Sequence, residues 1–395
     1  MEPTATAKRR RFRPQFSLRT LIVLTFIVAV AVTWAVIHER RYSAACDVVA
    51  RISDEGTVVV QDYWSGKERT LAAGELPGRW EDIVEVQWEM DFPRLKDLKP
   101  IQSGQRKYIF FGIDGSPIYD FTKPQKSPED IRRLGNLPRL TRLSIGDIDS
   151  GEEIEVVSQL QGLEYLALSG IEIKNNDLKH LAQLQNLKYL SFEGDGVTAA
   201  GLKHLAPLKE LCILDISRAH LGDELGDVLR QFPKLTHLYL EFAGIEKLHL
   251  KPPLNLRFLQ LGMEVQELSI ATSCQVEAID VSTTNITNAN FAAWDAHCGL
   301  KRLAANNELT VEALAAHPLA SQLEHLTVWT TSEETRHEWD SAIVNFPRLK
   351  SLVVLYPKHR LQVSAREILV KDQQRVIRDF DDVDDYWDSL DPTGP

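Results

Sequence analysis

The chain has 395 residues, of which 44% are hydrophobic and 26% are charged, and this composition excludes a disordered chain and a polytopic membrane protein. The formal net charge is −11, but residues 1–19 carry a net +5, which leaves −16 on the remainder. Because affinity for nucleic acid comes mainly from Lys and Arg, this acidic body argues against a nucleic acid partner.

The N-terminal region predicts a membrane anchor. An uncharged run extends from Thr20 to Ile37, and residues 21–37 as a helix would span about 25 Å, close to the ~30 Å hydrocarbon core. Six basic residues precede the run, whereas only Arg40 and Arg41 follow it closely, so the positive-inside bias places the N-terminus in the cytoplasm and the repeats outside it. We therefore predict a basic cytoplasmic tail at 1–19, a single-pass transmembrane anchor at 20–37 and a juxtamembrane helix at 38–54.

Two other interpretations of this run are a cleaved signal peptide and a buried helix. A signal peptide needs a shorter apolar core and a small-residue cleavage site directly after it. The segment "SAAC" at 43–46 weakly resembles a lipoprotein cleavage site, but the charged segment 38–41 separates it from the apolar run. The sequence therefore favours an uncleaved anchor.

Residues 55–130 show no repeat and predict a small mixed α+β domain. The segments "GTVVV", "VEVQW" and "KYIFFGI" are typical of strands, and turn signals occur at "YWSGK" and "IDGSP". We expect this domain to cap the exposed apolar face of the first repeat, and an independent ligand-binding domain is the alternative.

From residue 131 to 357 the pattern L-x-x-L-x-L recurs about every 23 residues. Ten occurrences begin at Leu140, Leu163, Leu187, Leu211, Leu235, Leu256, Val276, Leu300, Leu323 and Leu349. The second and third apolar residues of each occurrence lie two apart, as on one face of a strand. The segments "KNNDLKHLAQL" and "TAAGLKHLAPL" have helical spacing of their leucines. Asn176 or Asp177 in the first segment and Thr198 in the second are N-cap candidates. A unit of one strand and one helix cannot bury its own apolar face, so the units must stack.

These units resemble the leucine-rich repeat of the β-strand/α-helix type. The resemblance implies an α/β fold, a leucine-rich repeat solenoid with a parallel sheet on its concave face. Together with "RFRPQFSLRTLIVLTFIVAVAV", the chain also resembles membrane-anchored leucine-rich repeat proteins of planctomycete-type bacteria. The family places Asn or Cys three residues after the third Leu, where this chain has Ile171, Asp195, Ala219, Ala243 and Thr284. Between Leu235 and Val276 the spacings are too short for a full helix, so we expect an extended connection there.

The C-terminal region, 358–395, predicts a cap followed by an acidic tail. The run "RDFDDVDDYWDSLDP" lacks the Asp spacing and the Gly of a calcium-binding EF-hand loop. The four cysteines form no C-x-x-C pair, and free thiols are favoured over a bridge between Cys274 and Cys298. His180 and His204 occupy equivalent positions one repeat apart, which repeat symmetry alone explains, so we expect no metal site. The sequence shows no Gly-rich phosphate loop and no nucleophile elbow, so we also expect no cofactor and no enzymatic activity.

The outward face of the predicted strands contains the candidate binding residues. Aromatic and acidic side chains share this face, and aromatic residues are typical interface anchors. The candidates are Tyr165, Tyr189, Glu193, Asp215, His237, Tyr239, Glu241, Phe258, Asp280 and Trp329. Cross-strand packing of the aromatic rings is the alternative explanation of their positions.

The sequence thus predicts a membrane-anchored interaction protein. Its acidic, aromatic concave face would bind a protein or peptide with basic or apolar groups outside the cytoplasm. The alternative is a structural scaffold or spacer of the cell envelope without a specific ligand on the concave face.

Overall fold

The computed structural model describes most of the chain from residue 57 to residue 380. The described residues are 30, 40–46, 49, 57–62, 65, 67–72, 75–77, 81–88, 106–111, 117–123, 128–137, 139–146, 151–168, 173–271, 273–294, 299–329, 336–359, 362–371 and 374–380. The predicted anchor at 20–37, apart from Val30, and the acidic tail beyond Phe380 lie outside these residues. Within the described part, no helix has the length and apolar character that a membrane span requires.

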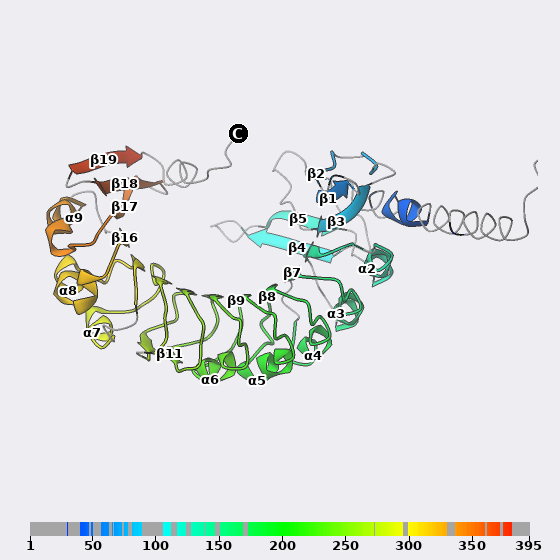
Figure 1. Ribbon diagram of the computed structural model, residues 1–395, viewed down its shortest axis with the longest axis horizontal. Coiled ribbons are helices and arrows are strands. Elements are labelled where there is room, and N and C mark those ends of the chain that lie inside the picture. The colour runs from blue at the N-terminus through cyan, green and yellow to red at the C-terminus, as the bar shows by residue number, and fades with distance from the viewer. Residues whose placement is uncertain are drawn as a thin grey trace, which may run out of the picture.

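A single parallel sheet runs through all ten repeats (Figure 1). Each repeat strand begins two residues after the first apolar residue of its L-x-x-L-x-L motif. These strands are β6 (Arg142–Ile145), β7 (Tyr165–Leu168), β8 (Tyr189–Glu193), β9 (Ile213–Ser217), β10 (His237–Glu241), β12 (Phe258–Leu261), β14 (Ala278–Asp280), β15 (Arg302–Ala305), β16 (His325–Trp329) and β17 (Ser351–His359). The sheet lines the inside of an arc and the helices lie on its outside, which is the leucine-rich repeat solenoid that the sequence predicts.

Short helices connect most of the strands on the convex side, and several of them start at ordinary capping residues. They are α3 (Gly151–Val157), α4 (Leu178–Leu181), α5 (Ala199–Leu202), α6 (Leu225–Leu229), α7 (Asn288–Phe291), α8 (Val311–Ala316) and α9 (Arg336–Ala342). Thr198 occupies the predicted N-cap position of α5, but its side chain makes no capping hydrogen bond, whereas Thr287 forms a capping box with Asn290 at α7. The extended connection predicted between Leu235 and Val276 is confirmed, because β11 (Lys247–Leu250) and β13 (Glu267–Ile270) pair in parallel there.

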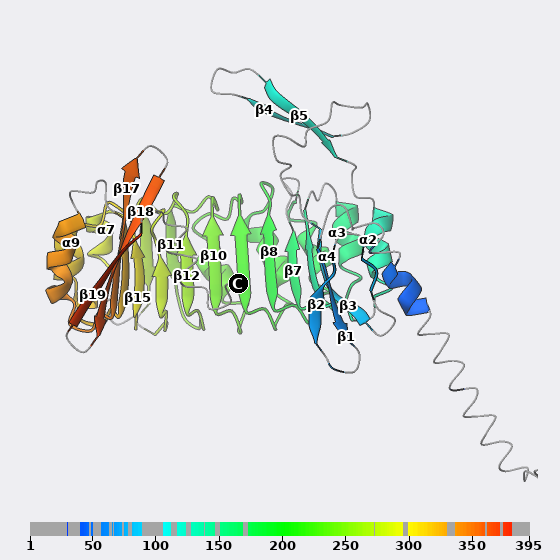
Figure 2. The same ribbon diagram turned by 90° about the horizontal axis from the view of Figure 1, so that it is seen from above.

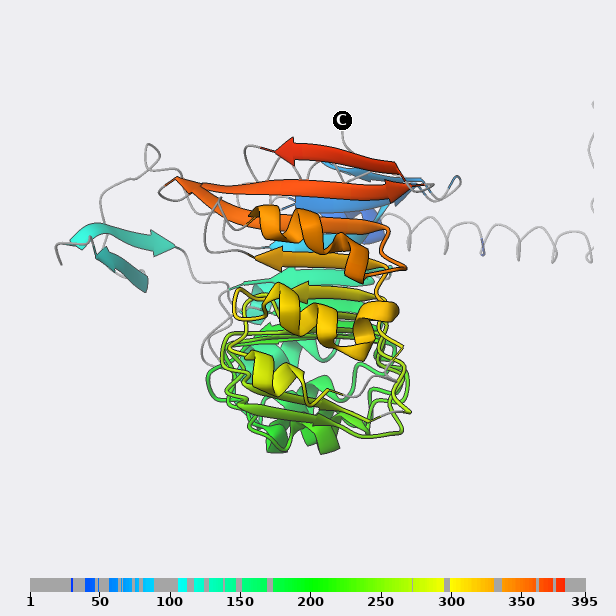
Figure 3. The same ribbon diagram turned by 90° about the vertical axis from the view of Figure 1, so that its left-hand side faces the viewer.

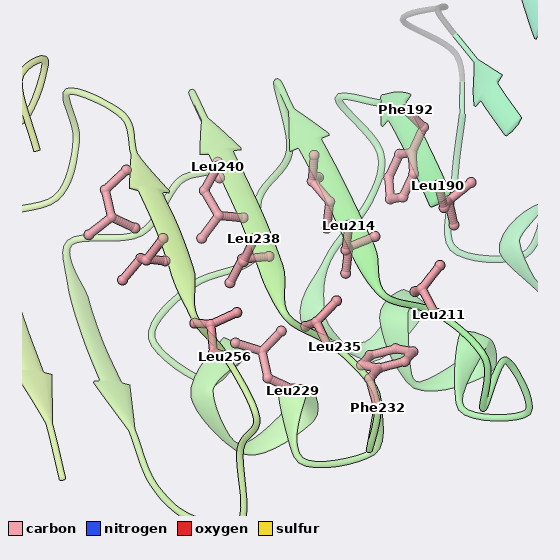
Figure 4. Close-up of a cluster of buried hydrophobic side chains, with 14 of the residues drawn as sticks. Leu190, Phe192, Leu211, Leu214, Leu229, Phe232, Leu235, Leu238, Leu240 and Leu256 are labelled. Carbon is pink, nitrogen blue, oxygen red and sulfur yellow. The ribbon is translucent and has the colours of Figure 1, made fainter. Parts of the chain in front are cut away.

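The leucines of the repeat motif form one continuous core between the sheet and the convex connections (Figure 4). Leu190, Leu214 and Leu238 occupy equivalent positions in three successive strands, and none of them has any exposed surface. Phe192, which is in register with Leu240, and Phe232, which lies near Leu211 and Leu235, belong to the same core and are about as deeply buried. Each leucine is therefore buried by the repeats before and after its own.

In the central repeats, where the family's asparagine is absent, backbone hydrogen bonds join neighbouring repeats near that position. The amide of Ala219 donates to the carbonyl of Phe242 over 3.0 Å, and the amide of Arg218 donates to the carbonyl of Glu241 over 2.9 Å. A buried asparagine, Asn306, supports the neighbouring repeat, and the sequence analysis did not predict this role. Its Nδ2 donates to the carbonyls of Thr284 and Ile286, both at 2.9 Å, and its Oδ1 accepts from two backbone amides of its own repeat.

Strands outside the repeats extend the sheet at both ends (Figures 2 and 3). At the N-terminal end, β3 (Glu81–Trp88) pairs in parallel with β6, and β1 (Thr57–Asp62) pairs antiparallel with β3 and with β2 (Glu68–Thr70). At the C-terminal end, β18 (Gln362–Lys371) and β19 (Gln374–Phe380) continue antiparallel from β17. The hairpin β4 (Arg106–Phe111) and β5 (Pro117–Lys123) forms a separate two-stranded sheet, and α2 (Pro128–Leu134) precedes β6.

We predict that Asn306→Ala lowers the free energy of unfolding by at least about 2 kcal/mol, because it leaves buried backbone carbonyls and amides without hydrogen-bond partners. Asn307→Ala is the matched control, since Asn307 is exposed and adjacent in sequence. Urea unfolding of the two variants and the wild type measures the difference. Equal stability of both variants would contradict a supporting role for Asn306.

Candidate functional site: the concave face

The strand register aligns the outward side chains of successive repeats in two columns on the concave face. The first column contains Arg142, Tyr165, Tyr189, Ile213, His237, Phe258, Ala278, Arg302, His325 and Ser351. The second column contains Ser144, Ala167, Ser191, Asp215, Tyr239, Gln260, Asp280, Ala304, Thr327 and Val353. Residues in one column are direct cross-strand neighbours and are close enough to interact.

Tyr165 and Tyr189 form a stacked pair near the N-terminal end of the array. Their ring centroids lie 4.1 Å apart and their planes differ by 10°. Both rings are half-buried, because each covers one face of the other and leaves the remaining surface toward the concave side. The pair therefore forms a compact apolar stack that carries two hydroxyl groups.

A second aromatic group lies on β10 and β12. The ring of Phe258 lies 5.0 Å from the ring of Tyr239 and 5.8 Å from the ring of His237, measured between centroids. The hydroxyl of Thr236 lies 2.9 Å from Nδ1 of His237 and also donates to the carbonyl of Cys212, which restrains the imidazole ring. All three rings are half-buried.

Asp215 lies between these two aromatic groups. Its Oδ2 accepts a hydrogen bond from the Ser191 hydroxyl over 3.0 Å. Burial raises the pKa of Asp215, the carboxylates of Glu241 and Glu193 raise it further, and the bond from Ser191 opposes the shift. The pKa of Tyr239 is also raised, first by burial and then by Tyr189 and Asp215.

The structure thus brings together eight of the ten predicted residues in one region, which we call the aromatic–acidic cluster. It consists of Tyr165, Tyr189, Glu193, Asp215, His237, Tyr239, Glu241 and Phe258. Arg218, which the sequence did not indicate, pairs with Glu193 over 3.3 Å. Ser191 was also missed, although its place in the second column next to Asp215 could have indicated it.

Of the two remaining predicted residues, Asp280 lies on the strand that pairs directly with β12, and Trp329 lies farther along the sheet. Asp280 is on β14, where its carboxylate accepts hydrogen bonds from the amide and hydroxyl of Ser282 over 2.9 and 2.7 Å. Trp329 is on β16, four strands from β10 in the sheet order. Asp280 therefore borders the aromatic–acidic cluster, whereas two strands separate Trp329 from β12.

A row of ion pairs follows the edge where the repeat strands begin. Lys188 pairs with Glu164 over 2.7 Å, Lys234 with Glu210 over 2.5 Å, and Lys350 with Glu324 over 2.5 Å. Exposed pairs of this kind contribute little to stability, typically about 0–1 kcal/mol each. They balance charge along this edge, in contrast to the excess of acids in the aromatic–acidic cluster.

Two further expectations concern metals and thiols. Across the described residues, no group of three or more His, Cys, Asp or Glu side chains could hold a metal ion. Cys274 is buried and free, as the sequence favoured, and Cys298 lies outside the described residues. The site therefore offers flat aromatic rings, carboxylates and hydroxyl groups on a continuous sheet.

Comparisons with known proteins concern the fold. No protein-family model matches the chain, and no curated protein matches it. Similar solved structures are leucine-rich repeat proteins, among them an internalin (inlF) from Listeria monocytogenes, which is 18% identical over 56% of this chain and 69% of its own, with a TM-score of 0.35. Others are TLR13 in complex with ssRNA13 (18% identity, 55% and 36% covered, TM-score 0.33) and mouse RP105 in complex with MD-1 (18%, 55% and 44%, 0.31).

The chain spans less than half the length of TLR13 and of RP105. The leucine-rich repeat fold of the chain itself rests on the strand register and the buried leucines described above. The resemblance to membrane-anchored proteins of planctomycete-type bacteria stays a prediction.

We predict that Asp215→Asn raises the free energy of unfolding at neutral pH. The pKa of Asp215 is higher in the folded chain than in the unfolded chain. The protonated carboxyl is therefore compatible with the fold at low pH, and stability is lost as pH rises through the folded-state pKa and the carboxyl becomes charged. The gain from Asp215→Asn should therefore shrink at a pH below about 3.8, the ordinary value. Thermal unfolding across pH measures this, with the exposed Asp195→Asn as control, and a pH-independent difference would contradict the assignment.

Proposed function

We propose that this chain is a membrane-anchored recognition protein whose aromatic–acidic cluster binds a protein or peptide outside the cytoplasm. The observation that carries the proposal is the position of Asp215. Its half-buried carboxylate lies beside two other acids and between two aromatic groups, on a sheet that repeat stacking holds rigid. Burial and the neighbouring carboxylates disfavour the charged form of Asp215, and a cationic group of a partner would offset this cost.

The partner that this surface fits presents basic and apolar groups. Tyr and Phe provide large, rigid contact areas at low cost in conformational entropy, and they are enriched among interface anchors. Glu193 has a cationic partner in Arg218, but Asp215 and Glu241 have no ion-pair partner among the described residues. A Lys or Arg side chain of the partner would neutralise these carboxylates and could lie over a neighbouring ring.

A structural scaffold or spacer of the cell envelope is the second candidate. The stacked pair of Tyr165 and Tyr189 favours it, because cross-strand aromatic pairs stabilise sheets without any ligand. The two candidates differ in what they predict for truncation of the aromatic rings in a variant that stays folded. Truncation of such rings leaves a scaffold intact and removes a binding surface.

We expect the combined change Tyr189→Ala, Tyr239→Ala and Phe258→Ala to abolish capture of a partner. Truncation of an interface anchor typically costs about 2 kcal/mol of binding free energy. The measurement uses the full-length chain in detergent as bait against solubilised envelope extract, and Val344→Ala on the convex side is the control, since this side chain is 72% exposed. All variants are first compared by thermal unfolding. Equal capture by the wild type and by a stably folded triple variant would favour the scaffold.

The anchoring at 20–37 has a separate test. We expect the chain to stay in the membrane pellet after alkaline carbonate extraction, because a transmembrane helix is held by its apolar length and not by charge. Protease added outside intact spheroplasts should digest the repeats and spare residues 1–19. Release by carbonate, or protection of the repeats, would contradict the proposed topology.

A further inference from the structure

Phe242 has an unusual backbone conformation at the edge where the repeat strands end. Its φ is 49°, in the left-handed region that bulky residues rarely adopt, and its side chain is 40% exposed. The fold requires this backbone geometry, because the carbonyl of Phe242 accepts the amide of Ala219 from the preceding repeat. The left-handed geometry itself does not require a phenyl ring, since glycine adopts it without strain, as Gly244 does at φ 62°.

Met263 lies beside Phe242 in the next repeat. Leu240 and Leu261 are paired in register, and Phe242 and Met263 each lie two residues after this pair. The backbones are close there, because a Cβ at Gly262 would lie 3.0 Å from the Phe242 amide nitrogen. The Glu264 carboxylate also accepts a hydrogen bond from the Gly244 amide, which ties the two segments together.

The exposure of these two apolar side chains is specific to this part of the edge. Met263 is 47% exposed, and no aromatic ring of the described residues stacks on Phe242. One repeat earlier, Arg218 has the same left-handed conformation at φ 52°, but its side chain is polar and pairs with Glu193. Two neighbouring repeats therefore leave large apolar side chains partly exposed where the preceding repeat has a charged one.

This pair of side chains, which we call the apolar step, is continuous with the aromatic–acidic cluster. Glu241 precedes Phe242 directly, and Tyr239 lies two residues earlier on the same strand. Glu241 is exposed and has no ion-pair partner within the described residues. A partner that contacts both the cluster and the apolar step therefore also contacts the Glu241 carboxylate, which lies between them.

We infer that Phe242 and Met263 receive an apolar side chain of the protein partner, and that this side chain neighbours a Lys or Arg that pairs with Glu241. The inference rests on the proposed function and names the chemistry of the partner segment. Charge complementarity selects the basic residue, and the two exposed apolar side chains select its neighbour. The binding face then extends from the concave sheet over the edge where the strands end.

The test uses a variant that removes the ring and not the fold. Phe242→Gly should leave the melting temperature unchanged or raise it, because glycine relieves the left-handed strain. Full-length chain in detergent is panned with phage-displayed random dodecapeptides, which are the probe. We expect enriched peptides to carry Lys or Arg next to an apolar residue, and Phe242→Gly or Met263→Ser to weaken their binding by roughly tenfold or more.

Arg218→Gly is the matched control, since it makes the same backbone change one repeat earlier. It should keep or increase the affinity, because it leaves Glu193 without its cation. Enrichment of acidic peptides, or binding that is insensitive to Phe242→Gly, would overturn the inference. So would self-association of the wild-type chain that Phe242→Gly abolishes, because the apolar step would then join two copies.

The same peptides separate this inference from the proposed function. Binding that is lost in the triple variant of Tyr189, Tyr239 and Phe258 but kept in Phe242→Gly leaves the proposed function standing and removes the inference. Binding that neither variant weakens removes both. Binding that both variants weaken supports a single face that includes the cluster and the apolar step.

Discussion

The in-register pairing of equivalent residues in successive parallel strands is the constraint on which the rest of the structure depends. Leu190, Leu214 and Leu238 are completely buried only because each lies against the same residue of its neighbours. A strand out of register by one residue would turn its leucines to solvent. The same register fixes the opposite face, so side chains that are about twenty-four residues apart in sequence become neighbours on the concave surface.

This constraint explains why the sequence predicted so much of the fold. Each L-x-x-L-x-L motif locates a strand, and short spacing around Leu256 correctly indicated extended connections. The same periodicity placed Tyr165 and Asp215 on the outward face. The periodicity could not predict features that depend on individual contacts or on local backbone geometry, because such features do not repeat along the sequence. Asn306 does not occupy the family's usual asparagine position, yet it bonds to a neighbouring repeat. Phenylalanine rarely adopts a left-handed φ, so its identity did not indicate the conformation of Phe242.

The concave face combines groups that stabilise the sheet with groups that do not. The stacked rings of Tyr165 and Tyr189 and the ion pairs along the edge where the strands begin favour the fold. The half-buried Asp215 beside Glu193 and Glu241 opposes it, because burial and like charges both disfavour the carboxylate. Natural proteins retain such unfavourable arrangements mainly at functional sites, and this is the ground on which we propose a binding role for the cluster.

Photo-crosslinking from the concave face in native membranes tests this account most directly. A benzophenone amino acid replaces Tyr239 in one chain and the exposed convex Val344 in another. Recognition at the aromatic–acidic cluster predicts a discrete cross-linked protein from position 239 that is absent from position 344. Equal products from both positions, or products from position 344 alone, would contradict it and leave the solenoid as a scaffold.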